Sequence, residues 1–555
     1  MSEAGVPLID RAYARRQAYR QLLVAALALA LFGVSGYGSE ASVDKLLDAE
    51  ALKQALALFG GLLTPDFSAA FVVRVGTLTL ESMAIATVGM ALALVIGIPL
   101  ALLAARVPRL ENAPQDAHWR RLLRGAVRWW ARTGLSILRA IPEIVWAFLF
   151  VRVLGLGPGP AVLAIGLTFG GIVGKLFAEL IDASDAQPAR ALEAAGGSRW
   201  AIVLHAVLPQ VRTQWLGYGL FRFECAIRSA AILGVVGAGG LGAEIELSIR
   251  YFQWHRLATT LLALLGCVAV VEMVSAYARQ RKQGTRLALG VAGAALALSL
   301  WQLDVDWPSL WSSQALVQTK LFLSGVTAPT TATAELAHAL WLMLQTIAMA
   351  AFATLLAALA ALLVAPFASR VLTVGGFLLA PPVARSKWHV LLHRSVLLSA
   401  RGILQLTRAM PELVWALLLV VWVGPGPFAG ALAIAAHTFG VLGRLFGEVY
   451  EDVEARRAKP PQLIEATGGS RFATWCHGVL PQCAAQLSSY TLFRFEVNVR
   501  ATAMVGFVGA GGIGDAIHTS ISLFHMSDLA MQLQVLLLAV VVVDIVGETI
   551  RRRLL

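Results

Sequence analysis

The chain has 555 residues, of which 58% are hydrophobic and only 14% are charged, and its mean hydropathy is +0.72. A chain this apolar exceeds what one soluble core can bury, and it contains many runs long enough to cross ~30 Å of hydrocarbon, so we expect an all-α, polytopic membrane protein. The net charge of +12 does not indicate a nucleic-acid partner, because Lys and Arg cluster between apolar runs, as they do in cytoplasmic loops.

The first half of the chain predicts six membrane spans. They are 21–36, 79–104, 133–155, 161–182, 212–234 and 258–277. The basic stretch RAYARRQAYR precedes the first span and no small-residue cleavage site is evident, which favours a retained anchor with its N-terminus inside. The arginine-rich loop after the second span and the segment ARQRKQGTR after the sixth are expected on the same, cytoplasmic side.

One polar stretch interrupts the apolar runs between the fourth and fifth spans. It reads EAAGGSRWAIVLHAVLPQ, from Glu193 to Gln210. The Gly pair, the cation, the short amphipathic run and the final Leu-Pro predict two short helices that join at a glycine hinge and stop at proline. A helical hairpin between two spans is placed to contact something outside the bilayer.

The second half repeats the first. Its expected spans are 287–301, 340–365, 398–423, 428–449, 486–507 and 528–548, and its copy of the hairpin is EATGGSRFATWCHGVLPQ, Glu465 to Gln482. RAIPEIVWA recurs as RAMPELVWA, GKLFAE as GRLFGE, LFRFE unchanged, and VVGAGGLG as FVGAGGIG. An even number of spans per half gives both copies one orientation, so we expect two parallel six-helix bundles, about 12 transmembrane helices, with both hairpins and both termini in the cytoplasm.

These motifs resemble type I ABC importer permeases of the MetI-like fold, most closely the phosphonate permease family, with two permease halves fused in one chain. The likeness covers about 76–278 within a first half at 1–285, and about 340–549 within a second half at 286–555. It implies a bacterial inner-membrane subunit that works with a dimer of cytoplasmic ATPases, which bind ATP and Mg, and with an external or periplasmic binding protein. The implied substrate is phosphonate, phosphite, hypophosphite or a related oxyanion; another small solute, such as a methionine-like amino acid, is the alternative.

The resemblance assigns the hairpins as coupling helices that dock on the ATPases. The implied contact residues are Glu193, Gly196, Gly197, Ser198, Arg199, Trp200 and Pro209, with Glu465, Gly468, Gly469, Ser470, Arg471, Phe472 and Pro481 in the second copy. The family carries an acidic residue about six positions before the hinge glycine, where this chain has Arg190 and Gln462. Glu193 and Glu465 lie one helical turn nearer the hinge, so the residues after the hinge are the firmer assignment.

Ionisable residues inside the expected spans are costly and therefore informative. Four pairs have i, i+4 spacing and are expected to share a helix face: Arg139 with Glu143, Arg408 with Glu412, Glu224 with Arg228, and Glu496 with Arg500. Internal pairing that stabilises the bundle is one interpretation. The sharper hypothesis is that Arg228 and Arg500, with Arg139 and Arg408 nearby, line a central pathway for an oxyanion.

The glycine runs GAGGLG and GAGGIG satisfy the GxGxxG pattern of dinucleotide-binding folds. That function needs a preceding strand, whereas these runs follow membrane spans. A tight turn with close backbone approach, or a gate, is expected instead. The residues assigned to these turns, together with two prolines expected to kink helices, are Gly237, Gly239, Gly240, Gly509, Gly511, Gly512, Pro142 and Pro411.

No catalytic constellation or metal site is predicted. His389 and His393 have helical metal spacing but no third ligand nearby, so an interfacial helix face is expected there. The four cysteines show no paired spacing and are interpreted as buried thiols. Nothing matches GxxxxGK[ST], so the chain is not expected to hydrolyse ATP by itself. A secondary transporter and a membrane-embedded enzyme are the remaining alternatives.

Overall fold

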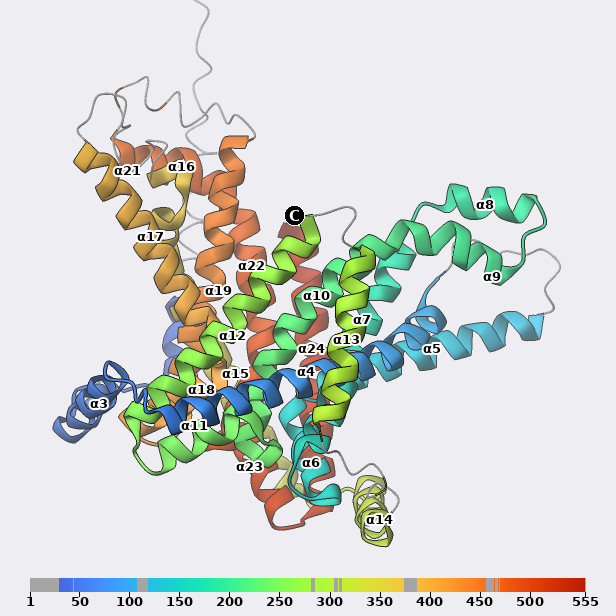
Figure 1. Ribbon diagram of the computed structural model, residues 1–555, viewed down its shortest axis with the longest axis horizontal. Helices are drawn as coiled ribbons and strands as arrows, with labels where there is room; N and C mark the ends of the chain where they lie inside the picture. The colour runs from blue at the N-terminus through green and yellow to red at the C-terminus, as the bar shows by residue number, and fades with distance from the viewer. Residues whose placement is uncertain are drawn as a thin grey trace, which may run out of the picture.

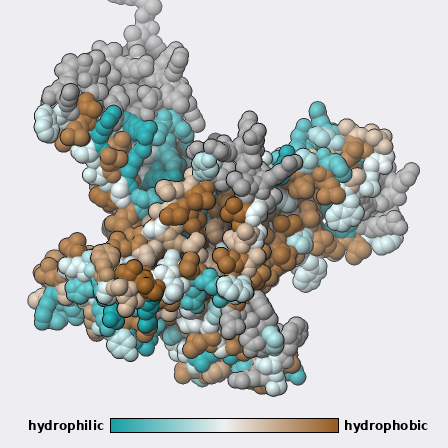
Figure 2. Space-filling model, viewed as in Figure 1, coloured by the Kyte–Doolittle hydropathy of each residue, from teal (hydrophilic) through white to brown (hydrophobic). Residues whose placement is uncertain are grey.

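The computed structural model describes residues 29–42, 44–106, 118–280, 285–303, 312–373, 387–455 and 470–554, with the single positions 308, 464 and 468. Within these ranges the chain is almost entirely helical and holds no β-strand, which confirms the all-α class. Long helices cross in the middle of the molecule and shorter ones lie at its two ends (Figure 1). Apolar side chains form a broad band across the middle of the visible face (Figure 2).

The helices of the two halves follow one another in the same order. In the first half they are α3 (Ala49–Leu62), α4 (Ala69–Ala104), α5 (His118–Ala140), α6 (Glu143–Leu154), α7 (Pro158–Asp182), α8 (Ala186–Ala194), α9 (Arg199–Ala201), α10 (Leu208–Leu233), α11 (Gly240–Arg250) and α12 (Trp254–Gln280). In the second half they are α13 (Thr285–Gln302), α14 (Ser313–Thr327), α15 (Thr333–Ala368), α17 (Lys387–Ala409), α18 (Glu412–Val423), α19 (Pro427–Ala455), α21 (Arg471–Ala473), α22 (Leu480–Val505), α23 (Gly512–Ser522) and α24 (Met526–Leu554). The matching order confirms the internal duplication.

Six helices in the described ranges are long and apolar enough to cross a membrane: α4, α7, α12, α15, α19 and α24. Two further candidates are bent pairs, Ile202–Ala238 with α11 at 60° and Val390–Ala409 with α18 at 92°. The structure therefore gives six to eight candidate spans, fewer than the twelve expected from the sequence.

Four of the expected spans are not among these candidates, and each differs from the six long apolar helices in its own way. The expected span 133–155 is divided between α5 and α6, and α22 carries three charged residues within its length. The apolar helix at Gly290–Gln302 is short, and the expected span 21–36 lies partly outside the described residues. Apolar runs in the sequence therefore include helices that are broken, short or charged as well as long, uninterrupted ones.

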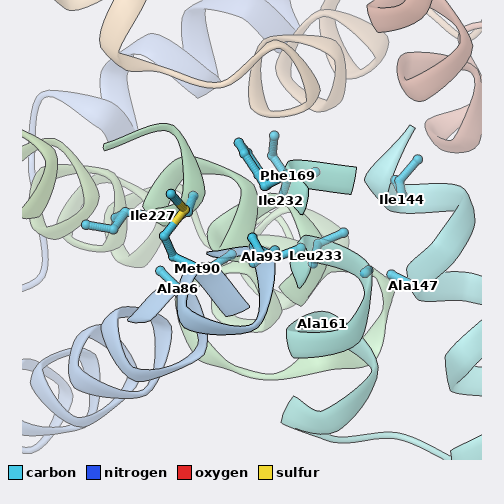
Figure 3. Close-up of a cluster of buried hydrophobic side chains, with 14 of the residues drawn as sticks. Ala86, Met90, Ala93, Ile144, Ala147, Ala161, Phe169, Ile227, Ile232 and Leu233 are labelled. Atoms are coloured by element: carbon cyan, nitrogen blue, oxygen red, sulfur yellow. The ribbon is translucent and has the colours of Figure 1, made fainter. Parts of the chain in front are cut away.

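Small residues bring the long helices of each half into close contact. A Cβ atom on Gly97 of α4 would lie 2.9 Å from the carbonyl oxygen of Gly170 on α7, so only glycine allows this approach. Buried side chains from α4, α6, α7 and α10 meet in the apolar cluster of the first half (Figure 3). In the second half α15 packs on α19 and α22 in the equivalent way.

The leading helix of each half packs on the other half. The ring of Phe32, in the helix Leu29–Gly38, stacks on Phe352 of α15 with a centroid distance of 4.8 Å. Conversely, α13 packs on α4 of the first half. The short helices are shared as well, since α3 contacts α12 and α18 while α14 contacts α24 and α6. This exchange joins the halves through apolar contacts in both directions.

The hairpins lie at one end of the molecule. In Figure 1, α8 and α9 lie at the right and α21 at the left, both at the end where the chain terminates. We call this the hairpin end. The helices α6, α11, α14 and α23 lie at the opposite end, which we call the turn end.

Candidate functional site

The first hairpin bends at Gly196, as the sequence predicts. Gly196 has φ +80°, and the N–H of Gly197 donates to the carbonyl oxygen of Leu192 at 2.9 Å. This arrangement ends α8 with a left-handed residue that a side chain would strain, which explains the glycine. Gly468 has φ +79° at the same place in the second copy.

A serine begins the second arm of each hairpin. The Ser198 hydroxyl accepts the backbone N–H of Ala201 at 3.2 Å, and Ser470 accepts that of Ala473 at 3.2 Å. Both bonds satisfy an N–H that has no partner within the helix, which is the usual role of serine at a helix N-terminus. The sequence SR after the glycines therefore fixes where the second arm starts.

The second arm does not stop at the proline, which corrects the expectation. Residues Ile202–Val207 form a π-helical turn that runs directly into α10, with the Leu208 N–H donating to the Val203 carbonyl. Pro209 lies in the first turn of α10, and Pro481 lies in the first turn of α22. The wider turn avoids the clash between a proline ring and the carbonyl one turn earlier.

Each hairpin exposes an aromatic side chain. Trp200 is 69% exposed and Phe472 is 67% exposed, whereas Glu193 is half-buried and Arg190 is exposed. The two rings are 272 residues apart and occupy equivalent positions of the two hairpins. Glu465, Gln462 and Gly469, and the side chains of Arg199 and Arg471, lie outside the described residues.

The glycine runs form two tight turns at the turn end. Gly237, Gly239, Gly240, Gly509, Gly511 and Gly512 all have φ between +67° and +91°. The turns carry equivalent bonds: the Gly157 N–H donates to the Gly237 carbonyl at 3.1 Å, and the Gly426 N–H to the Gly509 carbonyl at 2.9 Å. A helix, not a strand, precedes each turn, so the structure required for a dinucleotide is missing here.

The prolines Pro142 and Pro411 end one helix and begin another. Each lies directly before the first residue of a helix, Glu143 of α6 or Glu412 of α18. Arg139 and Glu143 therefore lie on different helices, and so do Arg408 and Glu412, so the expected one-face pairs do not form. The cause is proline itself, which disfavours helix in the residue before it and lacks an N–H.

The arginines before the breaks pair with the other half instead. Arg139 contacts Asp544 of α24 at 2.6 Å, and Arg500 lies 3.8 Å from the same carboxylate. Arg408 pairs with Glu272 of α12. Glu272 and Asp544 are 272 residues apart and occupy equivalent positions. Two equivalent ion pairs thus bind α5 to α24 and α17 to α12.

The remaining two expected pairs each share a helix. Glu496 and Arg500 lie on α22 and interact electrostatically, and Glu496 forms its ion pair with Arg551 of α24. Glu224 and Arg228 share α10 and interact electrostatically. Arg228 also donates to the carbonyl oxygen of Arg408, at 3.2 Å. That carbonyl lies at the end of α17, where the helix provides no N–H for it.

The two glutamates after the breaks have different partners. Glu143 accepts a hydrogen bond from the Ser229 hydroxyl at 2.8 Å. Glu412 lies 3.2 Å from Nε2 of His437, whose Nδ1 lies 2.9 Å from the Met410 carbonyl oxygen. Carboxylates kept in the interior of a membrane protein are functional candidates, and these two belong to equivalent helices.

Comparison with known proteins fits this architecture. Residues 97–283 and 372–555 each match the family described as binding-protein-dependent transport system inner membrane component. The chain belongs to this family of transport permeases.

Two relatives illustrate the range of similarity to this permease. It is 29% identical over 501 residues to the phosphate-import permease protein PhnE of Mycolicibacterium smegmatis, covering 87% of this chain and 86% of that protein. It is 37% identical to the phosphite transport system permease protein PtxC of Stutzerimonas stutzeri, covering 42% of this chain and 82% of that protein. A solved structure of the MetNI methionine ABC transporter matches with 20% identity and a TM-score of 0.30, covering 36% of this chain and 92% of that chain.

Sequence reasoning missed several polar residues of the permease interior. Glu272 and Asp544 were not singled out, although their spacing equals that of the hairpins. Arg222 and Arg494 were visible within the repeated LFRFE motif, which holds one in each half. Their partners could not be found from spacing, because they come from helices far away in the chain.

Proposed function

We propose that this permease is the membrane subunit of an ATP-driven importer that moves a small phosphorus oxyanion, such as phosphate, phosphite or a phosphonate, into the cytoplasm. The observation that carries the proposal is the similarity to the phosphate-import permease PhnE, which extends over both halves. The phosphite permease PtxC, similar to a single half, supports the same substrate class. Arginines in the interior suit an oxyanion, since guanidinium groups bind such oxygens in pairs.

The hairpins are the proposed contact with the motor. Trp200 and Phe472 are exposed on equivalent helices, so a partner that binds both is expected to be a dimer of like subunits. We assign this partner as a pair of ATPases, which would bind ATP and Mg, because the permease sequence lacks GxxxxGK[ST]. The hairpin end and both termini would then face the cytoplasm, and an external binding protein would deliver substrate at the turn end.

The interior residues have proposed roles in the pathway. Arg228 and Arg500, with Arg139 and Arg408 beside them, would favour the anion as it passes between the halves. The glycine turns would form the gate at the turn end, and the breaks at Pro142 and Pro411 would let α6 and α18 move relative to α5 and α17.

Uptake measurements test the proposed function. A bacterial strain deleted for its own phosphate and phosphite importers would express the permease with the ATPase and binding protein encoded beside it. We expect uptake of phosphate, phosphite or methylphosphonate that needs all three components, and no added uptake of methionine. Uptake of methionine alone, or oxyanion uptake that continues without the ATPase, would refute the proposal.

A further inference from the structure

The second half contains a buried polar network that surrounds one arginine. Thr354, Thr438 and Asn498 are each at most 2% exposed. Asn498 donates to the Thr354 hydroxyl at 2.8 Å and accepts from Thr438 at 3.0 Å. Nη2 of Arg494 lies 3.4 Å from both the Thr438 hydroxyl and the Asn498 side-chain oxygen. Burying three polar side chains in a membrane protein costs free energy unless they are mutually bonded, as they are here.

The first half has apolar residues at all three equivalent positions. Helices α4 and α15 begin 264 residues apart, which matches Thr354 with Met90; the offsets of 269 and 272 match Thr438 with Phe169 and Asn498 with Ala226. Met90 and Phe169 belong to the apolar cluster of the first half (Figure 3). The two halves therefore differ here: this part of the interior is polar in the second half and apolar in the first.

The arginines of the two LFRFE motifs differ accordingly. Arg222 donates from Nε to the Tyr218 hydroxyl at 2.8 Å, and its guanidinium lies over the rings of Phe169, Tyr218 and Phe221. In the first half the arginine cation is therefore stabilised by cation–π contacts with these rings. Arg494 has only neutral oxygens as hydrogen-bond acceptors within the described ranges, and its Nε is buried without a partner there. Its charge is held in place but not neutralised by a bonded carboxylate.

The charges around the two central glutamates are also unequal. Glu412 interacts electrostatically with His437, Arg494 and Arg228, the last of which comes from the first half. Glu143 accepts a hydrogen bond from the Ser229 hydroxyl and interacts electrostatically with Glu412 and with Arg222. Glu412 therefore lies near one guanidinium group from each half, whereas the guanidinium group near Glu143 comes from its own half. The Glu412 side chain is 20% exposed, so the group remains within reach of a solute.

The arginines of the first hypothesis, Arg228 and Arg500, are not equivalent either. Arg500 lies 3.8 Å from Asp544, which also receives Arg139. Arg228 bonds to a backbone carbonyl and to the Cys225 sulfur, both neutral acceptors. Arg228 of the first half and Arg494 of the second are therefore the two guanidinium groups near Glu412, and the hydrogen bonds of both go to neutral acceptors.

We propose that the permease holds its substrate at a single off-axis anion site, formed by Arg228 of the first half and Arg494 of the second, with the Thr354–Thr438–Asn498 network as the support that positions Arg494. This inference rests on the proposed function and names its site. A permease of two identical chains must present equal faces, whereas a fused chain can specialise one of them. The ligand class is a small tetrahedral oxyanion, which two guanidinium groups can bind at once.

The equivalent arginines supply a matched pair of variants. Arg494→Gln removes the proposed site, and Arg222→Gln makes the same change in the first half. With ATPase and binding protein present, we expect Arg494→Gln to lower uptake of inorganic phosphate and phosphite at least tenfold, while ATP hydrolysis stimulated by the loaded binding protein stays within about twofold of wild type. Arg222→Gln should keep uptake within about twofold. Equal losses in the two variants, or a larger loss in Arg222→Gln, would overturn the off-axis site.

A second variant decides the matter if Arg494→Gln does not accumulate in the membrane. Asn498→Asp is nearly isosteric and places a carboxylate beside Arg494, so it should neutralise the site and lower uptake at least tenfold. Membrane-inserted Asn498→Asp that takes up phosphate and phosphite at the wild-type rate would overturn the proposal. The proposed function fails separately: its failure is seen as absent oxyanion uptake in the wild type, before any variant is compared.

Discussion

Glycine at the two turns is required by both conformation and space. Gly240 has φ +67°, and a Cβ atom built there would lie 2.4 Å from the Ser82 hydroxyl. That hydroxyl accepts the Leu241 N–H at 2.9 Å, and Thr346 accepts the Ile513 N–H at 2.9 Å in the second half. A single atom on the glycine would therefore disturb a bond that joins the turn to the long helix α4.

We predict that Gly240→Ala lowers the thermal stability of the purified permease by several degrees. The left-handed conformation costs a residue with Cβ ~1–2 kcal/mol, and the hydrogen bond to Ser82 adds about 0.5–1.5 kcal/mol if it is lost. Gly266→Ala is the control, because Gly266 lies within α12 with open space around it. Size-exclusion after heating in detergent measures both, and equal melting of the two variants would contradict the assignment.

Two ion pairs join helices of one half to helices of the other. Arg139–Asp544 joins α5 to α24, and Arg408–Glu272 joins α17 to α12. In each pair the arginine lies at the end of a helix that stops before a proline. The side chains of Arg139 and Asp544 are 21% and 20% exposed, so the pair is largely removed from water. Removing one partner of such a pair leaves the other charge uncompensated in a poorly solvated place.

Asp544→Asn is expected to destabilise the permease, because it removes the carboxylate that pairs with Arg139 and lies 3.8 Å from Arg500. Fully buried pairs cost about 3–5 kcal/mol when one partner is removed, so partial exposure makes a loss of roughly 1–3 kcal/mol reasonable here. Glu548→Gln, on the same helix, is the control: its pair with Arg552 is exposed and is worth only about 0–1 kcal/mol. Melting in detergent compares them, and a Glu548 variant that melts as low as the Asp544 variant would refute the argument.

The exposed aromatic residues of the two hairpins lead to a prediction about binding of the ATPase. Because Trp200 and Phe472 are mostly exposed, replacing both with alanine should leave the fold unchanged and weaken binding of the ATPase. We expect co-purification of the ATPase to fall at least tenfold.

The control for this pair is Trp301→Ala, which removes a tryptophan that is 85% exposed on α13. That variant should bind the ATPase as the wild type does. Retention of the ATPase by the double hairpin variant would locate the motor contact elsewhere on the permease.

At the scale of the whole molecule, the exchange of leading helices makes the two halves dependent on one another. The helix Leu29–Gly38 packs on α15, and α13 packs on α4, so the described part of each leading helix is covered by the other half. If one half were expressed alone, its leading helix would lose the helix that covers it. The surface of α4 or α15 that packs on the other half's leading helix would also be exposed.

We therefore predict that residues 1–285 and 286–555, made as two chains, assemble when produced together and do not accumulate singly. Tagging one chain and recovering the other by affinity purification measures the assembly. Stable, monodisperse accumulation of either chain by itself would show that the exchange contributes little to stability.

The sequence by itself determined the membrane class, the duplication, the family and the glycine bends of both hairpins, because hydropathy, repeats and left-handed glycines are recorded in neighbouring residues. Only the tertiary structure decided how many straight spans form, that the helix continues through Pro209, and which acid each arginine meets. Arg139 and Asp544 are 405 residues apart, and spacing along one helix pointed to Glu143 instead. The partner of a buried charge depends on which helices pack together, and this packing is a property of the assembled bundle rather than of any segment.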